Sequence, residues 1–322
     1  MQNPICLPIA IFLMGPTASG KSQIALDIAK ALPIEIISVD SAQVYRYMNI
    51  GTAKPEQETL THTPHHLINL IDPDQTYSAA QFRKDALNIM QDISSRNKIP
   101  LLVGGTMLYF RALQEGLSVL PAADQYLRLQ LEHMAKKLGW PAMHQKLSEL
   151  DPVIAERIKP TDTQRIQRAL EVCYLTQQPM SEILKTSQPA DFPYRKVSIA
   201  LIPSDRSQLH SRIAERFRDM LNAGLIDEVQ FIRQRFSSLS MESPSMRCVG
   251  YRQVCLYLDN KIKHDEMHEM GIAATRQLAK RQLTWLRGIR VSNKIHELDC
   301  LSSDSSIRVH NLIRAVIEVC AD

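Results

Sequence analysis

The stretch GPTASGKS at residues 15–22 decides how this chain folds. It matches the pattern G-x-x-x-x-G-K-[ST], whose glycines let backbone N–H groups converge on phosphate oxygens. The apolar run at residues 8–14 is typical of a buried strand, and residues 21–32 repeat apolar positions with the period of a helix. Because strand, loop and helix follow one another in this order, the sequence predicts a bound di- or triphosphate more strongly than a chance match in an ordinary turn.

The residues of this phosphate loop have separate expected roles. Lys21 is expected to neutralise the outer phosphate, and the hydroxyl of Ser22 can ligate Mg²⁺. The N-terminus of the following helix adds partial positive charge. Because the loop recognises phosphates and not a nucleoside, it does not by itself indicate ATP. The predicted diphosphate-binding residues are Gly15, Pro16, Thr17, Ala18, Ser19, Gly20, Lys21 and Ser22, and the predicted metal ligand is Ser22.

Outward from the loop, strand patterns alternate with helical patterns. The expected strands are residues 8–14, 34–40, 65–72, 99–105 and 196–202. Ser78 followed by Gln81 predicts a capping box at the start of one helix, and Gly116 is expected to end another. This alternation predicts an α/β fold with a P-loop NTPase-like, doubly wound parallel sheet.

Strand patterns disappear between residues 117 and 195, where helical segments are separated by Pro and Gly. We therefore expect residues 1–116 to form the first part of the α/β core and residues 117–195 to form an inserted all-helical domain. Residues 196–322 are expected to complete the core and to end in basic helices.

The composition of the chain narrows its class. Its 322 residues are 44% hydrophobic and 22% charged, which is usual for a soluble globular enzyme. A net charge of +4 permits a polyanionic partner without requiring one. The six cysteines contain no C-x-x-C pair and fit no zinc-finger pattern, which favours reduced thiols. No apolar run is long enough to cross a membrane, so we expect a cytoplasmic protein. The sequence does not fix the oligomeric state, and a monomer with no obligate protein partner is the default expectation.

Polar residues end two other predicted strands. Asp40 closes the strand at residues 34–40, and Thr106 follows the strand at residues 99–105. Because open parallel sheets bind ligands at the carboxyl ends of strands, a carboxylate and a hydroxyl should meet the phosphate loop. Asp40 could also be a metal ligand or a turn residue, and Thr106 a simple helix N-cap. The strand at residues 99–105 does not end in the carboxylate that phosphoryl-transfer enzymes usually carry at this place, which argues against a small-molecule or nucleotide kinase.

Basic side chains gather in the second half of the chain. The clusters are Arg276, Lys280, Arg281, Arg287 and Arg290 on one helical segment, Arg165 and Arg168 one helical turn apart, and Arg247 and Arg252 around Gly250. A single basic cluster is usually a solvated face, but several of them in one phosphate-loop protein are compatible with the phosphate backbone of a nucleic acid as a partner. Tyr251 could stack on an unpaired base, as aromatic residues do when they read RNA loops.

Together these stretches resemble the tRNA dimethylallyltransferases, also called tRNA isopentenyltransferases, in their bacterial form. The resemblance rests on GPTASGKS, ISVDSAQVY, GTAKP, PHHLI, LLVGGTMLYF, QRIQRALEV, MRCVGYRQ and TRQLAKRQLTWLR. It implies Mg²⁺-assisted transfer of a dimethylallyl group from dimethylallyl diphosphate to N6 of adenosine 37, beside the anticodon, in tRNAs that read codons starting with U. The alternatives are an adenylate prenyltransferase, a P-loop kinase, and a non-catalytic RNA-binding GTPase-like protein.

The resemblance also implies a role for each matching residue. Lys21, Thr106 and Arg216 would stabilise the charge that grows on the diphosphate, although Arg212 lies one turn from Arg216 on the same face. Asp40 would accept the N6 proton as the amine attacks the allylic carbon. The implied catalytic residues are Asp40, Thr106, Lys21 and Arg216. The implied tRNA-binding residues are Asp40, Ser41, Ala42, Gln43, Thr106, Arg128, Gln164, Arg165, Ile166, Gln167, Arg168, Arg247, Cys248, Val249, Gly250, Tyr251 and Arg252.

Overall fold

The chain divides into two compact units, one of which is inserted into the other. The computed structural model describes residues 7–118, 120–186, 191–290 and 295–321. The first unit combines Met1–Leu113 with Pro193–Asp322, and the second unit is the continuous segment Gln114–Phe192. The insertion expected from the sequence covers residues 117–195.

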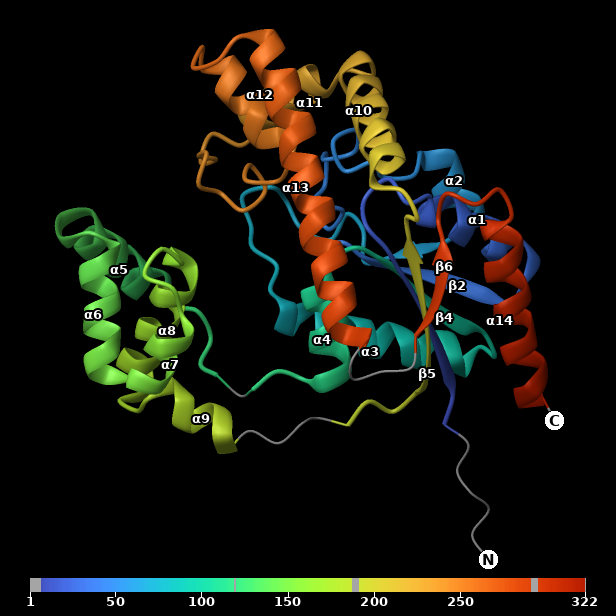
Figure 1. Ribbon diagram of the computed structural model, residues 1–322, viewed down its shortest axis with the longest axis horizontal. Coiled ribbons are helices and arrows are strands. Elements are labelled where there is room, and N and C mark those ends of the chain that lie inside the picture. Colours follow the sequence, from blue (N-terminus) through green and yellow to red (C-terminus); the bar gives the residue numbers. More distant parts are fainter. Residues whose placement is uncertain (1–6, 119, 187–190, 291–294, 322) are drawn as a thin grey trace, which may run out of the picture. The chain divides into compact units, whose positions relative to one another are not determined.

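A parallel sheet forms the centre of the first unit (Figure 1). Among the described residues it has six strands in the order β3-β2-β4-β1-β5-β6, and each neighbouring pair is parallel. The strands are β1 (Ile9–Met14), β2 (Ile34–Val39), β3 (His65–His66), β4 (Ile99–Gly104), β5 (Arg195–Ile202) and β6 (His296–Asp299). The α/β fold with a parallel sheet that the sequence predicts is confirmed.

Helices cover both faces of this sheet, because successive side chains of a strand point to opposite faces. On one face, α1 (Lys21–Ala31) and α14 (Ser305–Ala321) pack on a buried cluster that includes Leu13 of β1. On the other face, Phe12 of β1 meets Phe110 of α4 (Met107–Glu115), with ring centroids 5.3 Å apart. Next to α4 lies α3 (Ala79–Ser95), which begins with the predicted capping box of Ser78 and Gln81.

The remaining helices of the first unit build a second core beside the sheet. They are α10 (Arg206–Asn222), α11 (Leu225–Arg235), α12 (Tyr251–Leu258) and α13 (His264–Arg290), whereas α2 (Gln57–His62) has no buried residue and takes no part in this core. Met48, from the loop after β2, is buried in this second core with Phe217 of α10 and Met267 of α13. A Cβ at Gly271 of α13 would lie 2.1 Å from the Phe217 ring, so a glycine is needed for the close approach of α10 and α13.

The described residues of the second unit form helices joined by loops and contain no strand. Its helices are α5 (Gln125–Leu138), α6 (Trp140–Leu150), α7 (Pro152–Arg157), α8 (Thr163–Thr176) and α9 (Met180–Thr186). Leu131, Leu147 and Leu170 belong to its buried core. The buried carboxylate of Asp151 accepts the N–H of Ile154 at 3.0 Å and that of Ser181 at 2.7 Å, and so joins α7 to α9.

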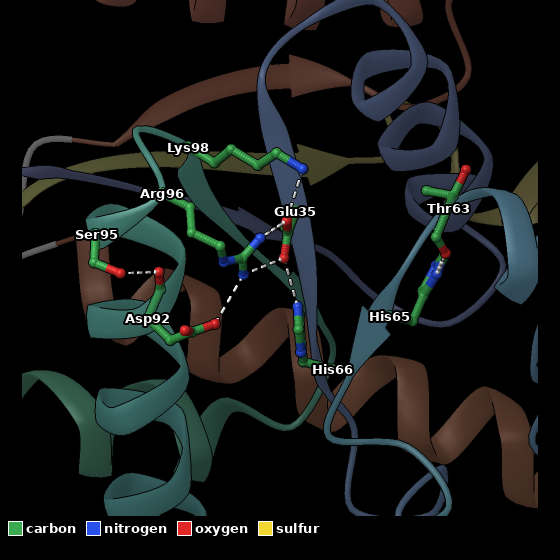
Figure 2. Close-up of polar contacts among 8 residues, drawn as sticks. All are labelled: Glu35, Thr63, His65, His66, Asp92, Ser95, Arg96 and Lys98. Carbon is green, nitrogen blue, oxygen red and sulfur yellow. Dashed lines mark hydrogen bonds and ion pairs between the residues drawn. The ribbon is translucent and has the colours of Figure 1, made fainter.

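A buried ion cluster secures the amino end of β2. Glu35 is only 4% exposed, and its carboxylate pairs with Arg96, with Lys98 at 2.8 Å and with His66 at 2.8 Å (Figure 2). Hydrogen bonds from Arg96, Lys98 and His66 outweigh the cost of burial and hold the pKa of Glu35 far below its usual range. The cluster ties β2 to β3 and to the turn between α3 and β4, at the amino ends of these strands, whereas the phosphate loop follows the carboxyl end of β1.

The third strand is much shorter than the sequence predicts. Only His65–His66 pairs with β2, whereas the expected strand continues to residue 72. Leu67 and Asn69 have φ values of 62° and 54°, a left-handed conformation that a strand cannot contain. The two-residue strand therefore turns into a loop that reaches the site.

Candidate active site

Three loops begin at the same level of the sheet. Val39 of β2 and Met14 of β1 both pair with Gly104 of β4, which lies between them. The segments that follow these strands, with Asp40, the phosphate loop and Thr106, are therefore neighbours. A Cβ at Gly104 would lie 2.0 Å from the carbonyl oxygen of Val39, so position 104 requires glycine. The structure brings together the three groups that the sequence predicts to meet.

The phosphate loop has the backbone shape of an anion cradle. Gly20 has a φ of 80°, and Ala18 a φ of 63°, so the chain turns sharply just before α1. The first N–H groups of α1 have no intrahelical acceptor and face the loop, where the helix dipole adds positive charge. The hydroxyl of Ser19 is buried without a hydrogen-bond partner in the described residues. An unpartnered buried donor inside a cradle is consistent with the predicted phosphate ligand.

Lys21 lies in the middle of this cradle. Its Nζ donates to the carbonyl of Pro16 at 3.0 Å, within its own loop. Burial and the nearby Arg216 guanidinium lower the pKa of Lys21 to about 8, whereas the Asp40 carboxylate acts in the opposite direction. Burial also lowers the pKa of Arg216, again against the effect of Asp40. Lys21, Arg216 and Asp40 therefore share one electrostatic neighbourhood, as predicted for catalytic groups around a diphosphate.

The carboxylate of Asp40 and the hydroxyl of Thr106 are held by short local bonds. The N–H of Ala42 donates to Oδ1 of Asp40 at 2.8 Å, and the N–H of Ser41 donates to Oγ1 of Thr106 at 3.0 Å. The N–H of Thr106 donates to the carbonyl of Val39 at 3.2 Å. Thr106 precedes α4, but its hydroxyl bonds to the Asp40 loop, so it is more than a helix N-cap.

Gln43 is fixed by both ends of its amide. Ser38 Oγ donates to its Oε1 at 2.8 Å, and its Nε2 donates to the carbonyl of Thr52 at 3.3 Å. The segment from Ser41 to Gln43, which the resemblance implies to bind tRNA, thus has a defined conformation before any ligand binds.

Two residues of the site, Lys54 and Glu228, are missed by the sequence analysis. Lys54, in the GTAKP stretch, is 9% exposed and donates to the Tyr45 carbonyl at 2.7 Å and to Asn69 Oδ1 at 2.6 Å. Burial lowers its pKa to about 8, and it lies beside a cavity of about 720 Å³ that Arg216 also lines. Its position inside a motif is the signal that could have identified it.

Glu228 of α11 fastens the loop that carries Lys54. Its carboxylate accepts the N–H groups of Asn49, Ile50 and Gly51 at 2.9, 2.8 and 3.2 Å. It also accepts the hydroxyl of Tyr251 at 2.6 Å. No sequence motif marks Glu228, because its four partners meet it only in the folded chain.

Two predicted tRNA contacts do not fit the structure. Tyr251 is completely buried in the second core and its hydroxyl is bonded to Glu228, so its ring cannot stack on a base. Ile166 is completely buried in the core of the second unit and has no side-chain surface for RNA. Both residues belong to short motifs that contain buried packing residues as well as exposed ones, and the sequence does not separate the two kinds.

Arg128 and Arg168 both pair with one buried carboxylate. Arg128 Nε donates to Glu171 Oε1 at 2.8 Å, and Arg168 Nη1 donates to Oε2 at 2.5 Å. Glu171 itself is inaccessible to solvent, and hydrogen bonds from the two arginines lower its pKa despite its burial. Both guanidiniums therefore stabilise the second unit, and contact with tRNA stays a prediction for them.

Apart from Gly250, which is buried, the other predicted tRNA contacts lie on accessible surface. Exposed side chains are those of Ser41, Gln164, Arg165, Arg247 and Arg252, and partly exposed ones are those of Ala42, Gln43, Gln167, Cys248 and Val249. On α13 the side chains of Arg276, Lys280, Arg281 and Arg287 are exposed, whereas that of Arg290 is outside the described residues. Cys173, Cys255 and Cys300 are buried free thiols, while Cys6 and Cys320 lie outside the described side chains.

Neither a membrane span nor a metal-binding cluster is found in the described parts of the chain. No described helix is both long and apolar enough to span a bilayer. Groups of three or more His, Cys, Asp or Glu side chains with the arrangement of metal ligands are absent from the same residues.

The fold and the site define an α/β protein with a phosphate-binding loop, an adjacent carboxylate and an inserted helical unit. A family model described as IPP transferase matches residues 43–289, and this chain belongs to that family. It is 61% identical to a tRNA dimethylallyltransferase of Nitrosomonas eutropha over 307 residues, which cover 95% of this chain and 96% of the relative. It is 63% identical to that of Nitrosospira multiformis over 297 residues, covering 92% and 91%.

Solved structures show the same similarity. A tRNA isopentenylpyrophosphate transferase from Bacillus halodurans is 35% identical, with a TM-score of 0.68, over 96% of this chain and 97% of that one. A eukaryotic dimethylallyltransferase described as acting on tRNA is 26% identical, with a TM-score of 0.80, over 97% of this chain and 80% of that one.

Proposed function

We propose that this protein transfers a dimethylallyl group from dimethylallyl diphosphate to N6 of adenosine 37, beside the anticodon, in tRNAs that read codons beginning with U. The observation that carries the proposal is the meeting of the phosphate loop, Asp40 and Thr106 at neighbouring strand ends. A phosphate cradle next to a carboxylate suits a reaction in which the diphosphate leaves and an amine attacks carbon.

In the transfer, the N6 amine forms a bond to the allylic C1 while the bond from C1 to the diphosphate oxygen breaks. The electron pair of the breaking bond goes to the diphosphate, where Lys21, Arg216 and the hydroxyl of Thr106 stabilise the new charge. The proton released by the amine goes to the carboxylate of Asp40. The Lys21 ammonium has three N–H donors, so it can keep its bond to the Pro16 carbonyl and still donate to the diphosphate.

The residues present also fit a magnesium ion bound with the donor. Mg²⁺ keeps several waters and binds through substrate phosphates plus one or two protein oxygens, so it does not need a cluster of carboxylates. The exposed hydroxyl of Ser22, at the first turn of α1, is the predicted ligand. When bound, the ion supplies additional charge stabilisation to the leaving diphosphate.

The basic surfaces of α13 and of the inserted unit support tRNA as the acceptor. Exposed Arg and Lys side chains neutralise backbone phosphates without reading sequence. An adenine in an anticodon loop can leave its stack at lower cost than one in a duplex, so N6 can reach Asp40. We place the reaction in the cytoplasm and expect a monomer to carry it out.

The test is direct. The protein is incubated with dimethylallyl diphosphate, Mg²⁺ and unmodified tRNA, and the tRNA is digested and analysed by mass. N6-dimethylallyl-adenosine is the expected product, and an excess of AMP should compete poorly with tRNA. Folded protein that binds both substrates and yields no such nucleoside would overturn the proposal, and efficient prenylation of AMP would favour an adenylate prenyltransferase.

A further inference from the structure

One glutamine of α13 lies against the phosphate loop. Gln282 is 9% exposed, although Arg281 beside it faces solvent. The N–H of Thr17 donates to Oε1 of Gln282 at 2.8 Å, and Nε2 of Gln282 donates to the carbonyl of Gly105 at 3.0 Å. A single side-chain amide thus connects the loop after β1 with the loop after β4.

The surroundings of this amide leave little room for change. A buried amide is costly unless its donor and acceptor are both bonded, and here each end has a partner. A Cβ at Gly105 would lie 2.2 Å from Nε2 of Gln282 and 3.3 Å from the carbonyl oxygen of Gly15. The bond between Gln282 and Gly105 therefore depends on the absence of a side chain at position 105.

The two loops that Gln282 joins carry different parts of the reaction. Thr17 belongs to the loop that would hold the diphosphate, while Gly105 directly precedes Thr106. Thr106 in turn accepts the N–H of Ser41, the neighbour of Asp40. We propose that Gln282 is a positioning residue, which holds the diphosphate loop in register with Thr106 and Asp40 so that donor and acceptor meet in line. This inference rests on the proposed function.

The expected effect follows from the geometry of in-line transfer. A displacement of about 1 Å between reacting groups can reduce the rate roughly 100-fold, even when both groups are present. Gln282 also occupies the N–H of Thr17, which leaves the diphosphate to bind the N–H groups at the start of α1. Loss of the amide should therefore loosen the loop and weaken the alignment together.

The first variant is Gln282→Leu, which keeps a similar volume and removes both hydrogen bonds. We expect kcat with tRNA to fall about tenfold or more and the KM for dimethylallyl diphosphate to rise, since both loops would be displaced. The melting temperature of the variant reports any general loss of stability. The control is Gln230→Leu, the same substitution at an exposed position of α11, which should leave all three quantities unchanged.

The second variant disturbs the same bond from its other end. Gly105→Ala places a methyl group against Nε2 of Gln282 and should lower kcat in the same way. Combined with Gln282→Ala, the alanine at position 105 meets no amide, so the double variant should be no slower than Gln282→Ala alone. Additive losses would show that the two positions act independently and would overturn the proposal.

Two further outcomes separate this inference from the proposed function. If Gln282→Leu lowers only the melting temperature and keeps the wild-type kcat and KM, the residue is merely structural and the inference fails. If the wild-type protein makes no prenylated adenosine, the proposed function fails. Binding of inorganic pyrophosphate then still tests the contact with the loop: weaker binding by Gln282→Leu supports it, and unchanged binding refutes it.

Discussion

Asp40 combines a fixed position with a free oxygen. Its Oδ1 accepts the N–H of Ala42, and within the part of the chain that the structure describes its Oδ2 has no hydrogen-bond partner. The Asx turn orients the carboxylate, and Oδ2 remains available to accept a proton. At the scale of single residues, the site thus combines an oriented carboxylate, which is the proposed base, with a phosphate loop in which the pKa of Lys21 is lowered.

Replacing Asp40 separates the base from the cradle. For Asp40→Asn we expect turnover to fall by about 10²–10⁴-fold, because the amide cannot take the N6 proton. Binding of pyrophosphate, measured by calorimetry, should be retained, since the phosphate loop is unchanged. Asp265→Asn, at an exposed position of α13, is the control. Turnover equal to wild type would remove Asp40 as the base.

The lowered pKa of Lys21 gives a pH dependence. Below about pH 8 the free protein carries a charged Lys21, and above it the lysine loses its proton. We therefore expect kcat/KM for dimethylallyl diphosphate to fall as the pH rises through about 8. Because the pKa of Lys54 is also lowered to about 8, the profile is repeated with Lys54→Met. The alkaline limb should persist in that variant, and its disappearance would assign the titration to Lys54.

At the scale of elements, the edge of the sheet depends on a buried charge. Glu35 connects β2 to β3 and to the segment after α3 through Arg96, Lys98 and His66. Its neighbour Asp92 pairs with the same Arg96 at 2.8 Å but is 64% exposed. Arg96 therefore has one buried carboxylate partner, Glu35, and one exposed carboxylate partner, Asp92.

Glu35→Gln should destabilise the first unit by about 1–3 kcal/mol, because the partly exposed Arg96 and Lys98 lose the buried carboxylate that accepts their hydrogen bonds. Asp92→Asn, the exposed control, should cost less than about 1 kcal/mol. The pKa of Glu35 is depressed in the folded state, so its contribution is present above the unfolded pKa near 4.5 and is lost as the pH falls. Urea unfolding at pH 7 and at pH 4 measures both effects, and equal costs for the two variants would contradict the assignment.

At the scale of the whole molecule, the mild net charge conceals an uneven distribution. The net charge is only +4, yet four exposed basic side chains lie along α13 from Arg276 to Arg287. Glu35 and Glu171, in contrast, are buried, and each pairs with partly exposed arginine side chains. Exposed basic residues of this kind attract a polyanion.

Reversing two charges on α13 tests this surface. For Lys280→Glu combined with Arg287→Glu we expect tRNA affinity to fall and the slope of log K against log[salt] to decrease by about 1 per lost phosphate contact. The KM for dimethylallyl diphosphate at saturating tRNA should stay unchanged. Arg314→Glu on α14 is the control, because this arginine is exposed elsewhere and pairs with Glu318. An unchanged salt slope would exclude α13 from the tRNA surface.

The local order of strands, loops and helices could be predicted from the sequence, because each depends on short-range patterns. The phosphate loop, the capping box at Ser78 and the insertion of helices are visible in the chain itself. The third strand could not be predicted correctly, since its pattern continues to residue 72 while the left-handed Leu67 and Asn69 end it early. The edge strand β6 is short and polar, and nothing in its sequence distinguishes it from a loop.

The sequence by itself determined which residues offer chemistry: a phosphate loop, the carboxylate of Asp40 and the hydroxyl of Thr106. Only the tertiary structure decided which of the other motif residues are buried and pack against other residues, and which face solvent. Tyr251 and Ile166 are buried, and Gln282 and Glu228 bond to loops more than 170 residues away in the chain. Sequence patterns report neighbours along the chain, whereas packing and hydrogen bonds between distant segments exist only after the chain has folded.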